Sequence, residues 1–178
     1  MTSPRRLADA PRVLAAMIFA VAMLTGCSSL SVSHLESRPV IATAPTSITM
    51  KFWRFEFTGA LSGDAYVIHG RATPVTASLP PWVDRLEELT LTAYLRDPAG
   101  NVLASAEKTF KAVPLGPDAV VPFAFTLAPA DQAAGNYGIS FGYKALYGSS
   151  SARNALGASV PPPAGSVFFA GEGAVLKE

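Results

Sequence analysis

Few residues of this chain combine the types and the spacing that catalysis needs. The two histidines, His34 and His69, stand far apart, and no Gly-x-Ser-x-Gly elbow accompanies them, so a serine-hydrolase triad is not predicted. A surface imidazole on a strand explains His69 better than a general base does, and His34 is expected to be solvated. Two histidines so far apart in the sequence do not indicate a metal site, so neither a metal nor another cofactor is expected.

Three carboxylates gather behind a tryptophan in the middle of the chain. Asp84, Glu87 and Glu88 follow Trp82, and paired carboxylates beside an aromatic ring are typical of sugar hydrolysis. Arg85 within the group favours the simpler interpretation, a solvated loop and strand edge. A glycan hydrolase using Asp84 and Glu88 therefore stays an alternative, and the expected function is non-catalytic.

The single cysteine, Cys27, is the strongest candidate for covalent chemistry. Arg5, Arg6 and Arg12 accompany the uncharged apolar run Val13–Leu24, which is shorter than the roughly 20 residues of a membrane-spanning helix. A basic region, a short apolar region and small residues before a cleavage point form the pattern of a secretory signal peptide. Interpretations of Cys27 as a buried apolar residue, a redox thiol or a metal ligand leave this order unexplained.

The segment Leu24-Thr25-Gly26-Cys27 resembles the lipobox of bacterial lipoprotein precursors. The resemblance implies cleavage between Gly26 and Cys27, acylation of Cys27 with chains such as palmitate, and permanent attachment to a lipid bilayer. The non-acidic Ser28 fits the periplasmic face of an outer membrane, in a Gram-negative cell, better than the inner membrane. An uncleaved anchor or an ordinary secretory signal is the alternative.

Removal of residues 1–26 leaves one domain of ordinary size and almost no net charge. It contains no block of like charge, so a nucleic-acid partner is not expected. It also has no cysteine besides Cys27, which excludes disulfides and thiolate metal sites. The expected partners are the bilayer, through Cys27, and an envelope protein whose identity the sequence does not specify.

Alternating apolar residues predict the strands that must position any binding surface. The clearest period of two runs over Leu89–Arg96, followed by the turn Asp97–Asn101 and a returning strand at Val102–Lys111. Its buried positions are Leu89, Leu91, Ala93 and Leu95, and its solvent-facing positions are Thr90, Thr92, Tyr94 and Arg96. Tyr94 and Trp82 are the candidate surface contacts, with coverage of Tyr94 by a neighbouring loop as the alternative.

The rest of the domain shows the same kind of pattern. Over Ile48–Phe57 the apolar positions change parity, so the sequence predicts a β-bulge near Phe52 and Trp53. Thr73–Trp82 carries three prolines and is expected to be a connection. Further strands are predicted over Asp64–Ala72, Val121–Leu127 and Tyr137–Ala145.

The corner before Tyr137 carries a second resemblance. The stretch from Leu127 to Phe141 is similar to the corner that leads into the penultimate strand of immunoglobulin-like sandwiches. In those domains a tyrosine near the strand start bonds back to the loop backbone, and Tyr137 holds that place. With about seven strands and no helix, the chain is predicted to be all-β, a single antiparallel Ig-like or transthyretin-like β-sandwich.

The chain is thus expected to divide into five segments, which the composition separates. They are a signal peptide at 1–26, a lipidated flexible tether at 27–47, the β-sandwich at 48–147, a low-complexity loop at 148–165 and an edge strand or tail at 166–178. The expected function is a non-catalytic binding or assembly module at the cell envelope. A pilot or accessory lipoprotein of a secretion or pilus complex is the alternative within this class.

Overall fold

The computed structural model describes residues 29–42, 44–116, 118–130, 136–149 and 166–177. Regular structure in these residues is antiparallel β-strand, apart from one 3-10 turn at Thr76–Ser78. The predicted signal peptide, the cleavage site at Gly26 and Cys27, and positions 150–165 of the predicted loop lie outside them. In the described part of the chain, no helix is long and apolar enough to cross a membrane.

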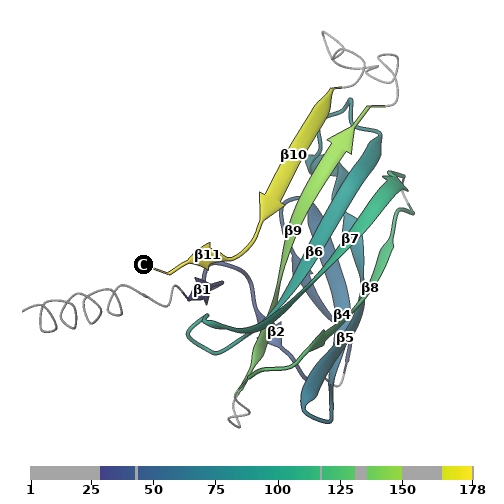
Figure 1. Ribbon diagram of the computed structural model, residues 1–178. Helices are drawn as coiled ribbons and strands as arrows, with labels where there is room; N and C mark the ends of the chain where they lie inside the picture. Colours follow the sequence, from purple (N-terminus) through teal and green to yellow (C-terminus); the bar gives the residue numbers. More distant parts are fainter. Residues whose placement is uncertain (1–28, 43, 117, 131–135, 150–165, 178) are drawn as a thin grey trace, which may run out of the picture.

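Two antiparallel sheets form the body of the protein (Figure 1). One sheet has the order β3-β4-β5-β8, with bounds Thr46–Thr49, Trp53–Ser62, Ala65–Pro74 and Val121–Leu127. The other has the order β10-β9-β6-β7, with bounds Val167–Glu172, Gly138–Gly148, Arg85–Arg96 and Val102–Pro114. Short β2, Arg38–Pro39, also pairs with β9, and a separate ribbon joins β1, Leu30–Ser31, to β11, Val175–Leu176. This architecture confirms the predicted all-β, antiparallel fold class.

An aromatic core joins the two sheets face to face. Phe141 of β9 stacks on Phe55 of β4 with ring centroids 4.7 Å apart. It also meets Phe57 at 5.1 Å and Phe123 of β8 at 5.4 Å. Burying a side chain of this size contributes about 1.5–3 kcal/mol, so the cluster is a main source of stability for the sandwich.

Strand β6 shows the predicted alternation. Its four inward side chains, Leu89, Leu91, Ala93 and Leu95, are all 0% exposed. The strand is longer than predicted because it already begins at Arg85. After it, Asp97–Asn101 reverses the chain, and Gly100 adopts a φ of 89°, which a residue with a side chain rarely takes.

The parity change near Phe52 arises from a tight turn, so the predicted bulge is wrong. Strand β3 ends at Thr49, and β4 begins at Trp53 and runs antiparallel to it. The Met50 N–H donates to the Trp53 carbonyl at 2.8 Å and closes the turn. Because the alternation of inward and outward side chains starts anew in each strand, Ile48 and Trp53 can both face the core.

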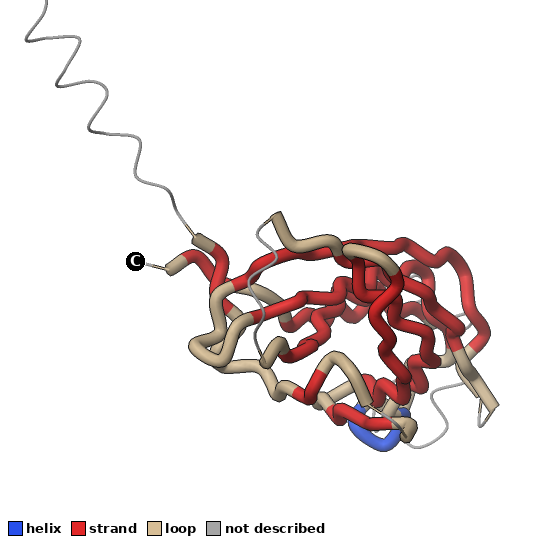
Figure 2. Tube along the Cα trace, turned by 90° about the horizontal axis from the view of Figure 1, so that it is seen from below, coloured by secondary structure: helices blue, strands red, loops and turns tan. Residues whose placement is uncertain are grey.

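Residues 29–42 and 44–47 lie on the sandwich, which differs from the flexible tether expected for 27–47. Val32 is 0% exposed and Leu35 is 7% exposed, and both pack with Tyr94. We call these three residues the terminal cluster; Met50, Val102 and Ala174 pack against it. In Figure 2 this end of the chain runs beside the C-terminal strand. The few apolar residues of a Ser- and Thr-rich segment therefore find partners distant in the sequence.

The outer face of β4 and β5 is charged. Arg71 Nε donates to the Glu56 carboxylate at 2.8 Å, and Arg54 lies 3.3 Å from the same group. The hydrogen bond from Arg71 and its charge hold the pKa of Glu56 below its ordinary value. Because these ion pairs are exposed, the outer face of that sheet is a solvent-facing surface.

Candidate functional site

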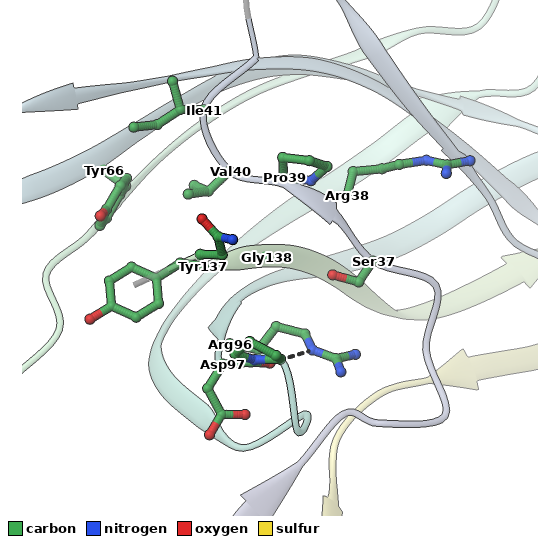
Figure 3. Close-up of a pocket in the computed structure, with 12 residues that line it drawn as sticks. Ser37, Arg38, Pro39, Val40, Ile41, Tyr66, Arg96, Asp97, Tyr137 and Gly138 are labelled. Atoms are coloured by element: carbon green, nitrogen blue, oxygen red, sulfur yellow. Dashed lines mark hydrogen bonds between the residues drawn. The ribbon is translucent and has the colours of Figure 1, made fainter. Parts of the chain in front are cut away.

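A groove of about 550 Å³ lies where the N-terminal segment crosses the sandwich, and we call it the Arg96 groove (Figure 3). The N-terminal segment forms one wall, and β5, the end of β6 and the start of β9 supply the others. Its lining residues are Ser37, Arg38, Pro39, Val40, Ile41, Tyr66, Arg96, Asp97, Pro98, Asn136, Tyr137 and Gly138.

Arg96 is a buried cation that holds the N-terminal segment in place. Arg96 is only 8% exposed, although the alternation of β6 predicts that it faces solvent. One guanidinium nitrogen, Nη1, donates to the carbonyls of Val32 at 3.0 Å and Leu35 at 3.5 Å. Nε donates to the Asp97 carbonyl at 3.2 Å. Within the described residues no ion pair includes Arg96, so backbone carbonyls provide its compensation.

The Asp97 carboxylate forms hydrogen bonds within the turn that follows β6. It accepts from the Asn101 N–H at 2.8 Å and from Asn101 Nδ2 at 2.6 Å. Figure 3 shows this carboxylate and the Arg96 guanidinium pointing to opposite sides. Burial raises the pKa of Asp97, but the hydrogen bonds outweigh it, so the net effect lowers the pKa. The carboxylate therefore stays anionic and fixes the turn that borders the groove.

Away from Arg96 and Asp97, the lining of the groove is aromatic and apolar. Tyr66 and Tyr137 meet edge to face with ring centroids 5.8 Å apart. Ile41 is 54% exposed, an open apolar side chain within the lining. Arg38 at the rim forms an ion pair with Glu36, and its Nε donates to a backbone carbonyl at 3.2 Å. Apolar contact area bordered by hydrogen-bonding groups suits binding of a ligand or partner.

Tyr94, a candidate surface contact, does not lie on an open surface. It is 8% exposed because the N-terminal segment covers it, and its hydroxyl accepts from the Ala174 N–H at 3.3 Å. This position matches the alternative in which a neighbouring segment covers the ring. Trp82, the other candidate contact, is half-buried in the loop before β6.

The carboxylates considered for sugar chemistry take part in local contacts. Glu87 accepts from Arg85 Nε at 2.6 Å, and Glu88 lies 3.6 Å from Lys111 Nζ. The Asp84 N–H donates to the Gly148 carbonyl at 3.2 Å.

His69 is exposed on β5. Across the described ranges, no three His, Cys, Asp or Glu side chains gather as a metal site.

Sequence reasoning missed the groove because its parts are remote from one another along the chain. Arg96 and Val32 are 64 positions apart, and Ile41 falls in the segment expected to be a tether. The available signals were the apolar residues Val32, Leu35 and Val40 inside that segment. Only the structure brings them to β6 and β9.

The search for related sequences found no relative of this chain. No family model matches the chain, and no curated protein sequence is significantly similar to it. The fold by itself defines the class: an all-β protein of antiparallel sheets, compatible with a β-sandwich.

Proposed function

We propose that this protein is a lipid-anchored, Ig-like or transthyretin-like β-sandwich of the bacterial cell envelope that binds a partner protein in the Arg96 groove. The lipobox-like segment ending at Cys27 supports the anchor. The position of Tyr137 directly before β9 supports the Ig-like comparison. Acylation at Cys27 would tether the sandwich that carries the groove to the membrane, on the periplasmic side if the membrane is an outer membrane.

Exposure of Ile41 within the groove is the observation that carries the binding proposal. An isoleucine that is 54% exposed, in a lining that also contains Tyr66 and Tyr137, offers the kind of anchor contact that dominates protein interfaces. Arg38 and Asn136 at the rim supply hydrogen-bonding groups around it. The partner is therefore expected to place an apolar side chain against Ile41 in the groove.

The anchor is tested on the mature protein from its native host. Mass spectrometry should find an N-terminal residue 27 carrying fatty acyl chains, and Triton X-114 partitioning should place the protein in the detergent phase. Retention of residues 1–26, or recovery in the aqueous phase alone, would contradict the anchor.

The groove is tested by comparing two variants with matched exposure. Ile41→Asp places a charge in the groove, and Leu61→Asp places one on the β4–β5 hairpin, where the leucine is 56% exposed. Cross-linking in intact cells, followed by purification, should show partner recovery reduced about tenfold for Ile41→Asp. Leu61→Asp should leave it unchanged. Equal recovery from both variants would contradict binding in the groove, and mislocalisation of the captured protein on deletion would identify a pilot role.

A further inference from the structure

The β1–β11 ribbon exposes apolar side chains at one corner of the molecule. Leu30 and Leu176 face each other as direct strand partners, and they are 40% and 66% exposed. Val175 beside them is 51% exposed. Figures 1 and 2 show the ribbon at the periphery, away from the two main sheets. The contacts within the described residues therefore leave these side chains in water.

The ribbon is also where the chain leaves the predicted anchor. The Lys177 N–H donates to the Ser29 carbonyl at 2.9 Å, which closes the ribbon at Ser29. Only Ser28 separates Ser29 from Cys27. Consecutive Cα atoms are 3.8 Å apart, so the Cα atoms of Cys27 and Ser29 can be no more than about 8 Å apart. An acyl chain on Cys27 therefore brings this ribbon to the level of the lipid headgroups.

We propose that the β1–β11 ribbon itself lies in the bilayer interface, with Leu30, Val175 and Leu176 at the boundary between headgroups and acyl chains. This inference rests on the proposed lipid anchor at Cys27. Apolar side chains at that depth leave water as they do when an interfacial element binds a membrane. The ribbon thus sets how the sandwich is oriented on the membrane.

The test uses a fluorescent probe on the full acylated protein. Leu176→Cys puts a thiol in the ribbon, and Val167→Cys puts one at the distant start of β10, where the native valine is 62% exposed. Cys27 is the only native cysteine, so acylation leaves the introduced thiol as the only reactive one. Each protein is labelled with a nitrobenzoxadiazole maleimide and reconstituted in vesicles of phosphatidylethanolamine and phosphatidylglycerol.

The expected result is a blue shift of the emission and quenching by nitroxide-labelled lipid at position 176, with neither at position 167. A water-like spectrum at position 176, or equal quenching at both positions, overturns the proposal while the lipid anchor stands. A blue shift that depends on the ratio of protein to lipid indicates a second copy on the ribbon and overturns it too. If the wild-type protein reacts with the maleimide, Cys27 carries a free thiol, and the anchor fails together with this inference.

Discussion

The core between the sheets and the terminal cluster are held together by different physical means. The core is large and continuous, and its aromatic rings, such as Phe55 of β4 and Phe141 of β9, come from strands of the two facing sheets. Among the described residues, the buried members of the terminal cluster are Val32, Leu35 and Tyr94. Because so small an apolar group contributes little by burial, it depends on the hydrogen bonds that Arg96 donates to the N-terminal backbone.

The comparison indicates two levels of cooperativity in one chain. The core stabilises the whole sandwich, so its loss should unfold every strand together. The terminal cluster fastens one segment, so its loss should release that segment and leave the sheets intact. Since the same segment forms a wall of the Arg96 groove and carries the predicted anchor, local stability there bears on the proposed function.

The largest effect is expected from Phe141→Ala in the core. The ring is 1% exposed and contacts Phe55, Phe57 and Phe123. Its removal leaves a cavity between the sheets and should lower the free energy of unfolding by about 3–5 kcal/mol. Urea unfolding followed by far-UV circular dichroism measures this loss as a lower midpoint. A midpoint like that of the wild type would show that the ring stack does not hold the sheets together.

This contrast also explains which parts of the fold were predictable from the sequence. The alternation in β6 and the turn Asp97–Asn101 are local patterns, so neighbouring residues were enough to predict them. The turn between Ile48 and Trp53 was mistaken for a bulge, because a parity change alone does not distinguish the two. For Tyr94 the alternation leaves two outcomes open, an exposed contact or coverage by a neighbouring loop, because the residues that cover it, Val32 and Leu35, are distant in the sequence.

The terminal cluster could not be predicted because its contacts are long-range. Ala174 reaches the Tyr94 hydroxyl from 80 positions away, and Arg96 reaches the Leu35 carbonyl from 61. A Ser- and Thr-rich segment after a signal peptide is typical of a linker. Its packing depends on a surface that two sheets create together, and the Arg96 groove depends on the same assembly.

A second large effect is expected from alkaline pH, through Tyr147 in the core. Burial of this fully buried residue raises the pKa of its hydroxyl from 10.0 to about 12, and the side chain of Trp53 acts in the opposite direction. The unfolded chain releases this proton at lower pH than the folded chain does. Tyr147 should therefore contribute a fall of about 2 kcal/mol in the free energy of unfolding between pH 10 and pH 12.

Urea unfolding at several pH values between 8 and 12 measures this loss. Tyr147→Phe serves as the control, because it keeps the ring and removes the proton. Its stability should fall less steeply over the same pH interval. Parallel pH profiles for the two proteins would contradict a role for the Tyr147 hydroxyl.

Arg96→Met should separate the two regions. It keeps much of the apolar stem but removes the guanidinium that donates to the carbonyls of Val32 and Leu35. Bonds to a charged donor contribute about 2 kcal/mol, so the segment around Val32 should open more often. Hydrogen exchange should speed up for the Val32 N–H, which donates to the Gly100 carbonyl at 2.9 Å, and stay slow in β6.

The matched control for Arg96→Met is Arg54→Met on the charged outer face. Arg54 lies 3.3 Å from Glu56, and its side chain is 53% exposed. Loss of such an exposed pair should change stability by less than about 1 kcal/mol, without effect on the Val32 N–H. Uniformly faster exchange throughout the sandwich of the Arg96 variant would show that the two regions do not unfold independently.

The smallest effect is expected at Asp97, whose carboxylate orders the turn against which the N-terminal segment lies. Because hydrogen bonds lower its pKa in the folded protein, the stabilisation is present at neutral pH and is lost as the pH falls below the ordinary value of 3.8. Asp97→Ala should remove it at every pH, at a cost of about 1 kcal/mol. The effect should reach the Val32 N–H through Gly100, so its exchange at pH 6 should quicken in the variant. If acid and the substitution both leave the Val32 N–H protected, the N-terminal segment is held by Arg96 without help from the turn.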